Sequence, residues 1–265
     1  MSASNPGYRG HVKAAAKFAR DVAVQFPRAR GWRQFKRSIA RVGDDDTYEY
    51  VYPLATYAPW RGDAEFLACF NLVRGNTLVD LYRCWELWTL VGETANIEGS
   101  FLEVGVWRGG TGALIARRAS LMGCDEPLYL CDTFTGVVKA SARDNLYEGG
   151  EHSDTSVATV SALLTSMGLL NAQLLEGMFP EETARNIPSD ERFRLCHIDV
   201  DVYESARDVL DWVWPRLSVG GVVVFDDFGF ASCRGIRDLV EEQRSMSDRF
   251  VFHNLNGHGI VLRTT

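Results

Sequence analysis

The sequence predicts an α/β fold with a doubly wound, mostly parallel sheet, and three observations support this prediction. Residues 101–112, FLEVGVWRGGTG, are a short apolar run broken by glycines, as at a strand that ends in a tight turn. Residues 111–122 continue with the apolar spacing of a helix that packs on a sheet. The apolar runs 128–131 and 222–225 are each followed directly by aspartate. Ligands of open α/β sheets bind at the carboxyl ends of such strands, so these glycines and aspartates are the first candidates for a site.

Composition limits the class of protein. The chain has 265 residues, a formal net charge of -7 and a hydrophobic fraction of 46%. This length suits one large α/β domain, expected at 66–265, preceded by an extension at 1–65. The negative charge argues against binding to nucleic acid, because phosphate groups would be repelled. We therefore expect small molecules as partners.

The cysteines predict the compartment. None of the six forms a CxxC pair and most lie in apolar runs, which is typical of buried, reduced thiols rather than of a zinc ribbon or a thioredoxin-like site. The first residues lack the apolar core of a signal peptide, and no apolar run approaches membrane-spanning length. A cytoplasmic location without a membrane partner is expected.

The extension at 1–65 has two parts. Residues 8–42 are basic, with a predicted helix at 11–26, and we expect a solvated face or a subunit contact rather than a membrane anchor. Residues 47–60, TYEYVYPLATYAPW, carry aromatic rings that stack on a sugar or fill a core or a subunit interface. The extension is therefore expected to be a helical lid or an oligomer contact, and the assembly a homo-oligomer.

The helical spacing over 66–91 predicts a helix that precedes and covers the sheet. Residues 137–155 are polar and without periodicity, and so long a loop in a compact domain is typically a lid or a binding loop. Tyr147 and His152 are its candidates for contact with a substrate. Three elements are expected to follow: a helix at 157–167, a strand at 173–176 and a short helix from Pro180.

The glycine loop discriminates between cofactor classes. A dinucleotide-binding fold has GxGxxG after its first strand, whereas this loop reads ExGxxxGGxG from Glu103. A carboxylate here repels a pyrophosphate and attracts a sulfonium and an amino group, which favours S-adenosylmethionine over NAD. Asp132, at the end of the next strand, is placed to accept the hydroxyls of an adenosine ribose. The alternative is an ordinary strand-end carboxylate beside an ordinary tight turn.

Four aspartates follow two later strands of the predicted sheet. They are Asp199, Asp201, Asp226 and Asp227. Between them we expect a helix at 203–217, terminated by Gly220-Gly221. Because parallel strands end at one edge of a sheet, the carboxylates should converge beside the glycine loop, where their repulsion calls for a cation. Oxygen ligands favour Mg²⁺. The alternative is that these aspartates are helix caps and solvated strand ends.

Two further features concern the sheet itself. His197 lies in the strand before the first aspartate, and we expect a core histidine whose side chain points away from the face of the aspartates. Residues 250–255 and 259–263 flank Asn256-Gly257, a dipeptide typical of hairpin turns. The sheet should therefore end in an antiparallel hairpin, unlike that of the usual nucleotide dehydrogenase.

The segments FLEVGVWRGG, YLCDTFTG, HIDVDVYES and VVVFDDFG, in that order and spacing, resemble the macrocin O-methyltransferase family. The resemblance covers residues 70–240 and implies a seven-stranded, Rossmann-like class I methyltransferase fold that uses S-adenosylmethionine and Mg²⁺. The chain departs from the family pattern in three places. HIDVDVY lacks the glycine that often separates the two aspartates, Thr133 replaces a common serine, and the segment after Gly136 is not the usual proline-bearing one.

The resemblance also implies roles for individual residues. Asp201 would be the general base, and Asp199, Asp226 and Asp227 would be the metal ligands. Glu176 would lie near the adenine. The candidate cofactor-binding residues are Glu103, Gly105, Trp107, Arg108, Gly109, Asp132, Thr133, Phe134, Glu176 and Asp199.

The expected reaction is methyl transfer from S-adenosylmethionine to a sugar hydroxyl of an antibiotic glycoside or a nucleotide sugar. A free alcohol is a poor nucleophile at neutral pH, so a metal ion and a base are needed to activate it. Three alternatives stay open: a catechol as acceptor, an NAD-dependent oxidoreductase, and a non-catalytic subunit that binds S-adenosylmethionine.

Overall fold

The computed structural model describes residues 47–48, 51, 55–144 and 146–265, and residues from 55 onward belong to one compact unit. The helix expected at 11–26 and residues 49–50 and 52–54 of the aromatic segment lie outside the described residues. Trp60, which the sequence assigned to the extension, packs against the core of the α/β unit and lies 5.3 Å from the ring of Tyr82.

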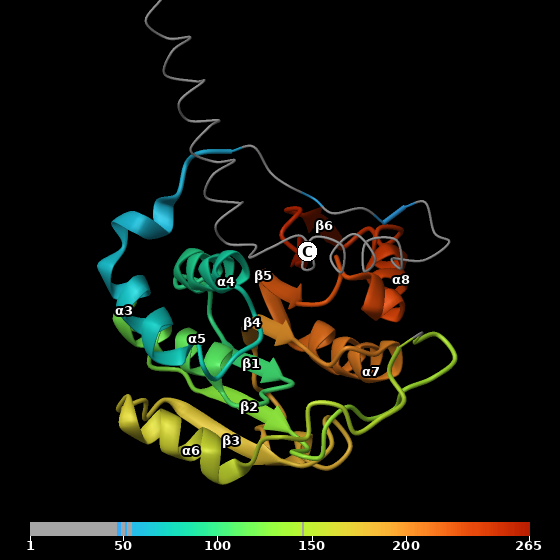
Figure 1. Cartoon of the computed structure of the whole chain (residues 1–265). Coiled ribbons are helices and arrows are strands. Elements are labelled where there is room, and N and C mark those ends of the chain that lie inside the picture. Colours follow the sequence, from blue (N-terminus) through green and yellow to red (C-terminus); the bar gives the residue numbers. More distant parts are fainter. Residues whose placement is uncertain (1–46, 49–50, 52–54, 145) are drawn as a thin grey trace, which may run out of the picture. The chain divides into compact units, whose positions relative to one another are not determined.

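The unit is built on a seven-stranded sheet in the order β3-β2-β1-β4-β5-β7-β6 (Figure 1). The first five strands run parallel, and β7 pairs antiparallel with both β5 and β6. The strands are β1 Ser100–Val104, β2 Leu128–Asp132, β3 Ala172–Glu176, β4 Phe193–Ile198, β5 Leu217–Phe225, β6 Arg249–His253 and β7 Gly259–Arg263. This confirms the predicted doubly wound sheet with its C-terminal hairpin.

Helices cover both faces of the sheet (Figure 1). One face carries α3 Ala64–Val73, α4 Leu81–Glu93, α5 Gly110–Leu121 and α6 Val157–Ser166, and the other carries α7 Tyr203–Val213 and α8 Arg234–Gln243. Side chains of a strand alternate between the faces, so Phe101 joins the core under α4 and α5 while Leu102 joins the core under α7 and α8. The two cores fix the strand ends at which the site is built.

Three expected elements differ from the structure. The helix expected over 66–91 is two helices, because Asp80 caps α4 by accepting the backbone N–H groups of Tyr82 and Arg83. In place of a helix from Pro180 there is a turn followed by a short 3-10 helix, Ala184–Asn186.

The third difference lies after α7. This helix ends at Val213 because Pro215 has no N–H with which to continue it, and a 3-10 turn at Trp214–Arg216 leads into β5. Gly220 and Gly221 therefore lie inside β5 and do not terminate the helix.

The glycine loop depends most strictly on glycine at position 105. The φ of Gly105 is +89°, and a Cβ atom there would lie 1.8 Å from the backbone oxygen of Asp199. Gly123, which follows the end of α5, has a φ of +73° and no atom within 4 Å of its Cβ position. At both positions the left-handed conformation costs an alanine about 1–2 kcal/mol. Only at position 105 would the added methyl group also force the ends of β1 and β4 apart.

We therefore expect Gly105→Ala to lower the free energy of unfolding by clearly more than Gly123→Ala does. Equilibrium urea unfolding of the two variants and the wild type measures the difference. Equal unfolding midpoints for the two variants would contradict the close packing of these strand ends.

Candidate active site

A cavity of about 290 Å³ lies at the carboxyl ends of β1, β2, β4 and β5. Of the residues predicted for the site, those lining it are Gly105, Trp107, Asp132, Thr133, Asp199, Asp201, Asp226 and Asp227. Tyr147 and His152, from the long loop, line it as well. The described lining does not include the predicted cofactor residues Glu103, Arg108, Gly109, Phe134 and Glu176. Most of the predicted site residues thus converge on one cavity, and these five do not line it.

Asp132 organises the glycine loop. Its Oδ2 accepts the backbone N–H groups of Val106 and Trp107 at 2.7 and 2.8 Å, and its Oδ1 accepts that of Phe134 at 2.7 Å. A carboxylate offers about four lone-pair sites, so one is left for a ligand while all three bonds persist. A ribose that donated both hydroxyls to Asp132 would therefore displace one backbone bond.

The long loop is tied to the glycine loop through Asp154. This carboxylate accepts the indole N–H of Trp107 at 2.8 Å and pairs with Arg108 at 2.5 Å. Thr155 donates to the backbone oxygen of Trp107. Gly109, with a φ of +84°, caps the start of α5. Arg108 and Gly109 thus hold the glycine loop in shape, and the long loop contributes Tyr147 and His152 to the cavity lining.

Glu103 does not face the cavity as the cofactor prediction requires. It is fully buried on the α4 and α5 side of the sheet, and His197 Nδ1 lies 2.9 Å from its Oε1. The expectation of a core histidine is confirmed, but the predicted orientation of His197 was wrong. Residues two apart in a strand share a face, so His197 points to the same side as Asp199.

The four aspartates converge. Carboxylate oxygens of Asp199, Asp226 and Asp227 lie within 4.8 Å of one another, as do ligand atoms of Asp201, Asp227 and Cys233. Asp226 and Asp227 are buried at 2% and 7% exposure. The predicted metal-ligand group therefore exists as a cluster of oxygen atoms beside the cavity.

The charges in this cluster are compensated unevenly. Burial alone would raise the pKa of Asp226, but the adjacent rings of His197 and His258 and the charge of Arg83 hold it well below its usual value. Burial and the repulsion of neighbouring carboxylates raise the pKa of both Asp199 and Asp227 well above the usual range. A bound cation would therefore compensate mainly the charges of Asp199 and Asp227. Three carboxylates beside a cavity suit a hard divalent ion that keeps some of its water, so the residues fit Mg²⁺.

Asp201 stands slightly apart from these three. Its backbone has a φ of +65°, a strained conformation of the kind that concentrates at functional sites. Its N–H donates to Asp227 Oδ2 at 3.1 Å, and its Oδ1 accepts the hydroxyl of Tyr147 at 2.5 Å. Burial raises the pKa of Asp201, although the hydrogen bond from Tyr147 opposes that shift. A half-buried carboxylate of raised pKa at a cavity wall is suited to accept a proton.

Sequence reasoning missed Arg83 and His258, which pair with Asp226, and Cys233, which joins Asp201 and Asp227. Arg83 lies in α4 and His258 beside the hairpin, far along the chain from the motifs. Local patterns carry no signal for such contacts.

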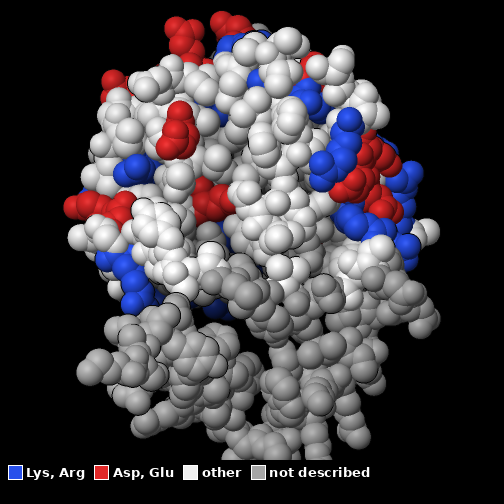
Figure 2. Space-filling view, turned by 90° about the horizontal axis from the view of Figure 1, so that it is seen from above, with Lys and Arg blue, Asp and Glu red and all other residues white. Residues whose placement is uncertain are grey.

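On the face shown in Figure 2, Lys and Arg side chains lie among Asp and Glu side chains. The expectation that the chain does not bind nucleic acid stays a prediction. Within the described part of the chain, no helix has the length and apolar character needed to cross a bilayer.

Proteins similar to this chain in sequence include two that are named as O-methyltransferases. The chain is 34% identical over 169 residues to mycinamicin III 3''-O-methyltransferase of Micromonospora griseorubida, covering 58% of this chain and 65% of that protein. It is 31% identical over 184 residues to a rhamnosyl-tetracenomycin-C 4'-O-methyltransferase of Streptomyces olivaceus, covering 64% of this chain and 67% of that one. The chain thus matches about two thirds of the length of these relatives.

Solved structures agree on the fold. The O-methyltransferase NovP superposes with a TM-score of 0.63 at 26% identity, covering 72% of this chain and 83% of its own. The calicheamicin methyltransferase CalS11 superposes with a TM-score of 0.58 at 17% identity, covering 82% and 98%. The sequence model of the macrocin O-methyltransferase family (TylF) matches residues 74–257, which include the glycine loop and all four aspartates. This chain belongs to the macrocin O-methyltransferase family.

Proposed function

We propose that this chain transfers a methyl group from S-adenosylmethionine to a sugar hydroxyl of a glycosylated natural product or a nucleotide sugar, with Mg²⁺ bound. The observation that carries the proposal is the convergence of the glycine loop, Asp132 and the four aspartates on one cavity. The acceptor class is supported by two relatives that are named for methylation of positions on antibiotics, one of them a rhamnosyl derivative.

The residues of the cavity divide by role. Gly105, Trp107, Asp132 and Thr133 would hold S-adenosylmethionine, which supplies an electrophilic methyl group when bound. Asp199, Asp226 and Asp227 would hold Mg²⁺, which lowers the pKa of a coordinated hydroxyl.

Two side chains then act on the acceptor's proton. Asp201 takes the proton of the acceptor hydroxyl, and Tyr147 holds the Asp201 carboxylate in place through their hydrogen bond. The tie between Asp154 and the glycine loop keeps the long loop over the cavity, which positions the reactants and limits water.

Ligand binding and methyl transfer test the proposal. Thermal unfolding with S-adenosylhomocysteine, NAD and MgCl₂ should show stabilisation by the first and the last, about 2.7 kcal/mol at 100 times Kd. Mass spectrometry should then detect one added methyl group on a nucleotide sugar or a macrolide glycoside. Stabilisation by NAD alone would overturn the proposal, and methylation of a catechol but of no sugar would replace its acceptor.

We further propose that the protein acts in the cytoplasm and as a homo-oligomer. All six cysteines are free and buried, which fits a reducing compartment. A role for residues 1–65 in oligomer contacts or as a lid stays a prediction, and light scattering of the full chain and of a chain lacking residues 1–46 would test the former.

A further inference from the structure

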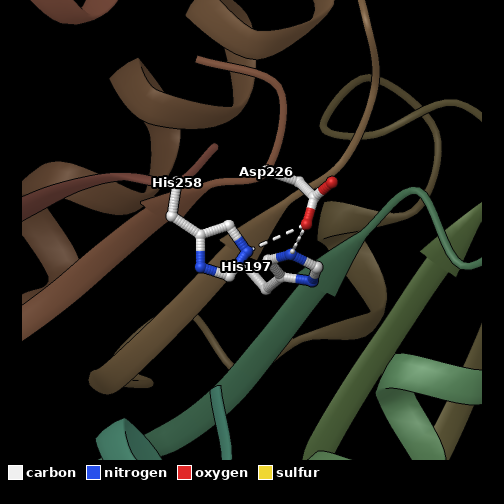
Figure 3. Close-up of side chains that lie close together, drawn as sticks. All are labelled: His197, Asp226 and His258. Carbon is white, nitrogen blue, oxygen red and sulfur yellow. Dashed lines mark hydrogen bonds and ion pairs between the residues drawn. The ribbon is translucent and has the colours of Figure 1, made fainter. Parts of the chain in front are cut away.

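His197, Asp226 and His258 form a buried cluster next to the aspartates (Figure 3). The two histidines are fully buried, and Asp226 is 2% exposed. His258 Nε2 lies 2.9 Å and His197 Nε2 lies 3.5 Å from the same oxygen, Asp226 Oδ1. Figure 3 shows both rings turning a nitrogen toward this carboxylate. Asp226 follows β5, which lies between β4, with His197, and β7, which begins directly after His258. Three potential metal ligands thus meet at one point.

Each of the three side chains also contacts a charged residue outside the cluster. Nδ1 of His258 lies 2.7 Å from Glu86 Oε2, and Nδ1 of His197 lies 2.9 Å from Glu103 Oε1. Arg83 contacts the other oxygen of Asp226. Histidines that bind metal ions almost always give their second nitrogen to a carboxylate or a carbonyl in this way, which fixes the ring and raises its basicity.

The cluster has an open ligand position that hydrogen bonds do not explain. His197 Nε2 makes no hydrogen bond among the described residues, and its 3.5 Å separation from Asp226 is longer than a hydrogen bond normally is. Buried polar atoms are rarely left without a partner. A fully buried ring nitrogen that has no hydrogen bond and points toward a carboxylate is placed to bind a metal ion together with that carboxylate.

The separations suit a small four-coordinate ion. Zinc–nitrogen and zinc–oxygen bonds of about 2.0–2.1 Å at tetrahedral angles place ligand atoms about 3.3 Å apart. The observed separations of 2.9 and 3.5 Å lie on either side of that value. Imidazole nitrogens favour Zn²⁺ and its neighbours over Mg²⁺. Asp226 and Arg83 also line the cavity, which gives an ion a path of entry.

We propose that His197, His258 and Asp226 bind one Zn²⁺ ion, at a site that shares only Asp226 with the oxygen cluster of Asp199 and Asp227. Three protein ligands leave a position for water. This site does not depend on the proposed methyl transfer.

A ring nitrogen that binds a metal ion carries no proton, so His197 and His258 would bind Zn²⁺ through unprotonated Nε2 atoms.

Metal titration of the full-length protein, freed of metal with a chelator and dialysed, tests the proposal. We expect one Zn²⁺ per chain in competition with a chromogenic chelator, undisturbed by excess Mg²⁺. Co²⁺ at the same site should give the strong visible absorption of four-coordinate cobalt. Absence of Zn²⁺ binding would overturn the proposal and mean that ion pairs and hydrogen bonds alone hold the cluster together.

Matched variants separate this site from the oxygen cluster. Glu86→Gln leaves all three ligands in place and should weaken Zn²⁺ binding about 10–100-fold. His258→Gln should weaken it more, and Asp227→Asn should leave it unchanged. Equal Zn²⁺ affinity in the wild type and both Glu86→Gln and His258→Gln would overturn the proposal. If His258→Gln does not fold by circular dichroism, the Glu86→Gln affinity decides.

Discussion

Replacing Asp201 with Asn is expected to lower kcat for methyl transfer by about 10²–10⁴-fold, the usual worth of a positioned general base. The carboxylate lies at the cavity wall, and Tyr147 holds it at 2.5 Å. Asparagine keeps the size of the side chain and tolerates the φ of +65° at this position, so the fold should persist. What is lost is the oxygen that can take up a proton. Steady-state kinetics at saturating cofactor and Mg²⁺ measures the effect.

Two further variants show whether that loss is chemical. Tyr147→Phe keeps the carboxylate but removes a hydrogen bond that lowers the pKa of Asp201, so the acid limb of the rate profile should move to higher pH. Asp211→Asn, which removes an exposed carboxylate from α7, should leave kcat and KM unchanged. An Asp201→Asn enzyme with nearly full rate would remove Asp201 from the mechanism.

The sequence allowed the fold to be predicted because its strongest signals are local. A buried strand, a glycine turn and a helix occupy 101–122 without interruption, and Asn256-Gly257 marks the hairpin. Convergence of the aspartates followed from topology alone, because the carboxyl ends of parallel strands share an edge. The error over 66–91 arose because helical spacing continues across the turn between α3 and α4, where only Gly75 and the cap Asp80 mark the break.

What could not be predicted is how each carboxylate is paired. Arg83 and Glu86 come from α4, and His258 comes from the residue before β7. Arg83 and His258 contact Asp226, and Glu86 contacts His258. These contacts depend on the packing of α4 over the sheet and on strand order, which no pattern within 101–228 encodes. The same limit applies to Glu103, whose buried partner His197 lies on the neighbouring strand β4. The acidic residues of the site were predicted from the sequence. Which of these carboxylates is already paired with an arginine or a histidine is shown only by the tertiary contacts.

Removal of divalent ions is expected to abolish methyl transfer and to destabilise the protein in a pH-dependent way. Burial and mutual repulsion raise the pKa of Asp199 and Asp227 in the folded state above the value of about 3.9 that aspartate has in the unfolded chain. Between about pH 4 and the raised pKa values, the metal-free folded state therefore binds more protons than the unfolded state does. Its free energy of unfolding should fall as pH rises from about 4 toward the raised pKa values. Mg²⁺ replaces these protons, so the increase in Tm on adding MgCl₂ should be larger at pH 8 than at pH 6.

Asp227→Asn is the matched variant, because it removes one of the two uncompensated charges and keeps an oxygen that can accept the backbone N–H of Asp201. At pH 8 the metal-free variant should be at least as stable as the metal-free wild type, since a buried charge without a partner is costly. It should also lose the rise in Tm with MgCl₂, together with activity. Differential scanning calorimetry with EDTA and with MgCl₂ gives both comparisons. Full turnover of the wild type in EDTA, or a metal-free Asp227→Asn protein much less stable than the wild type, would show that these carboxylates are compensated without an ion.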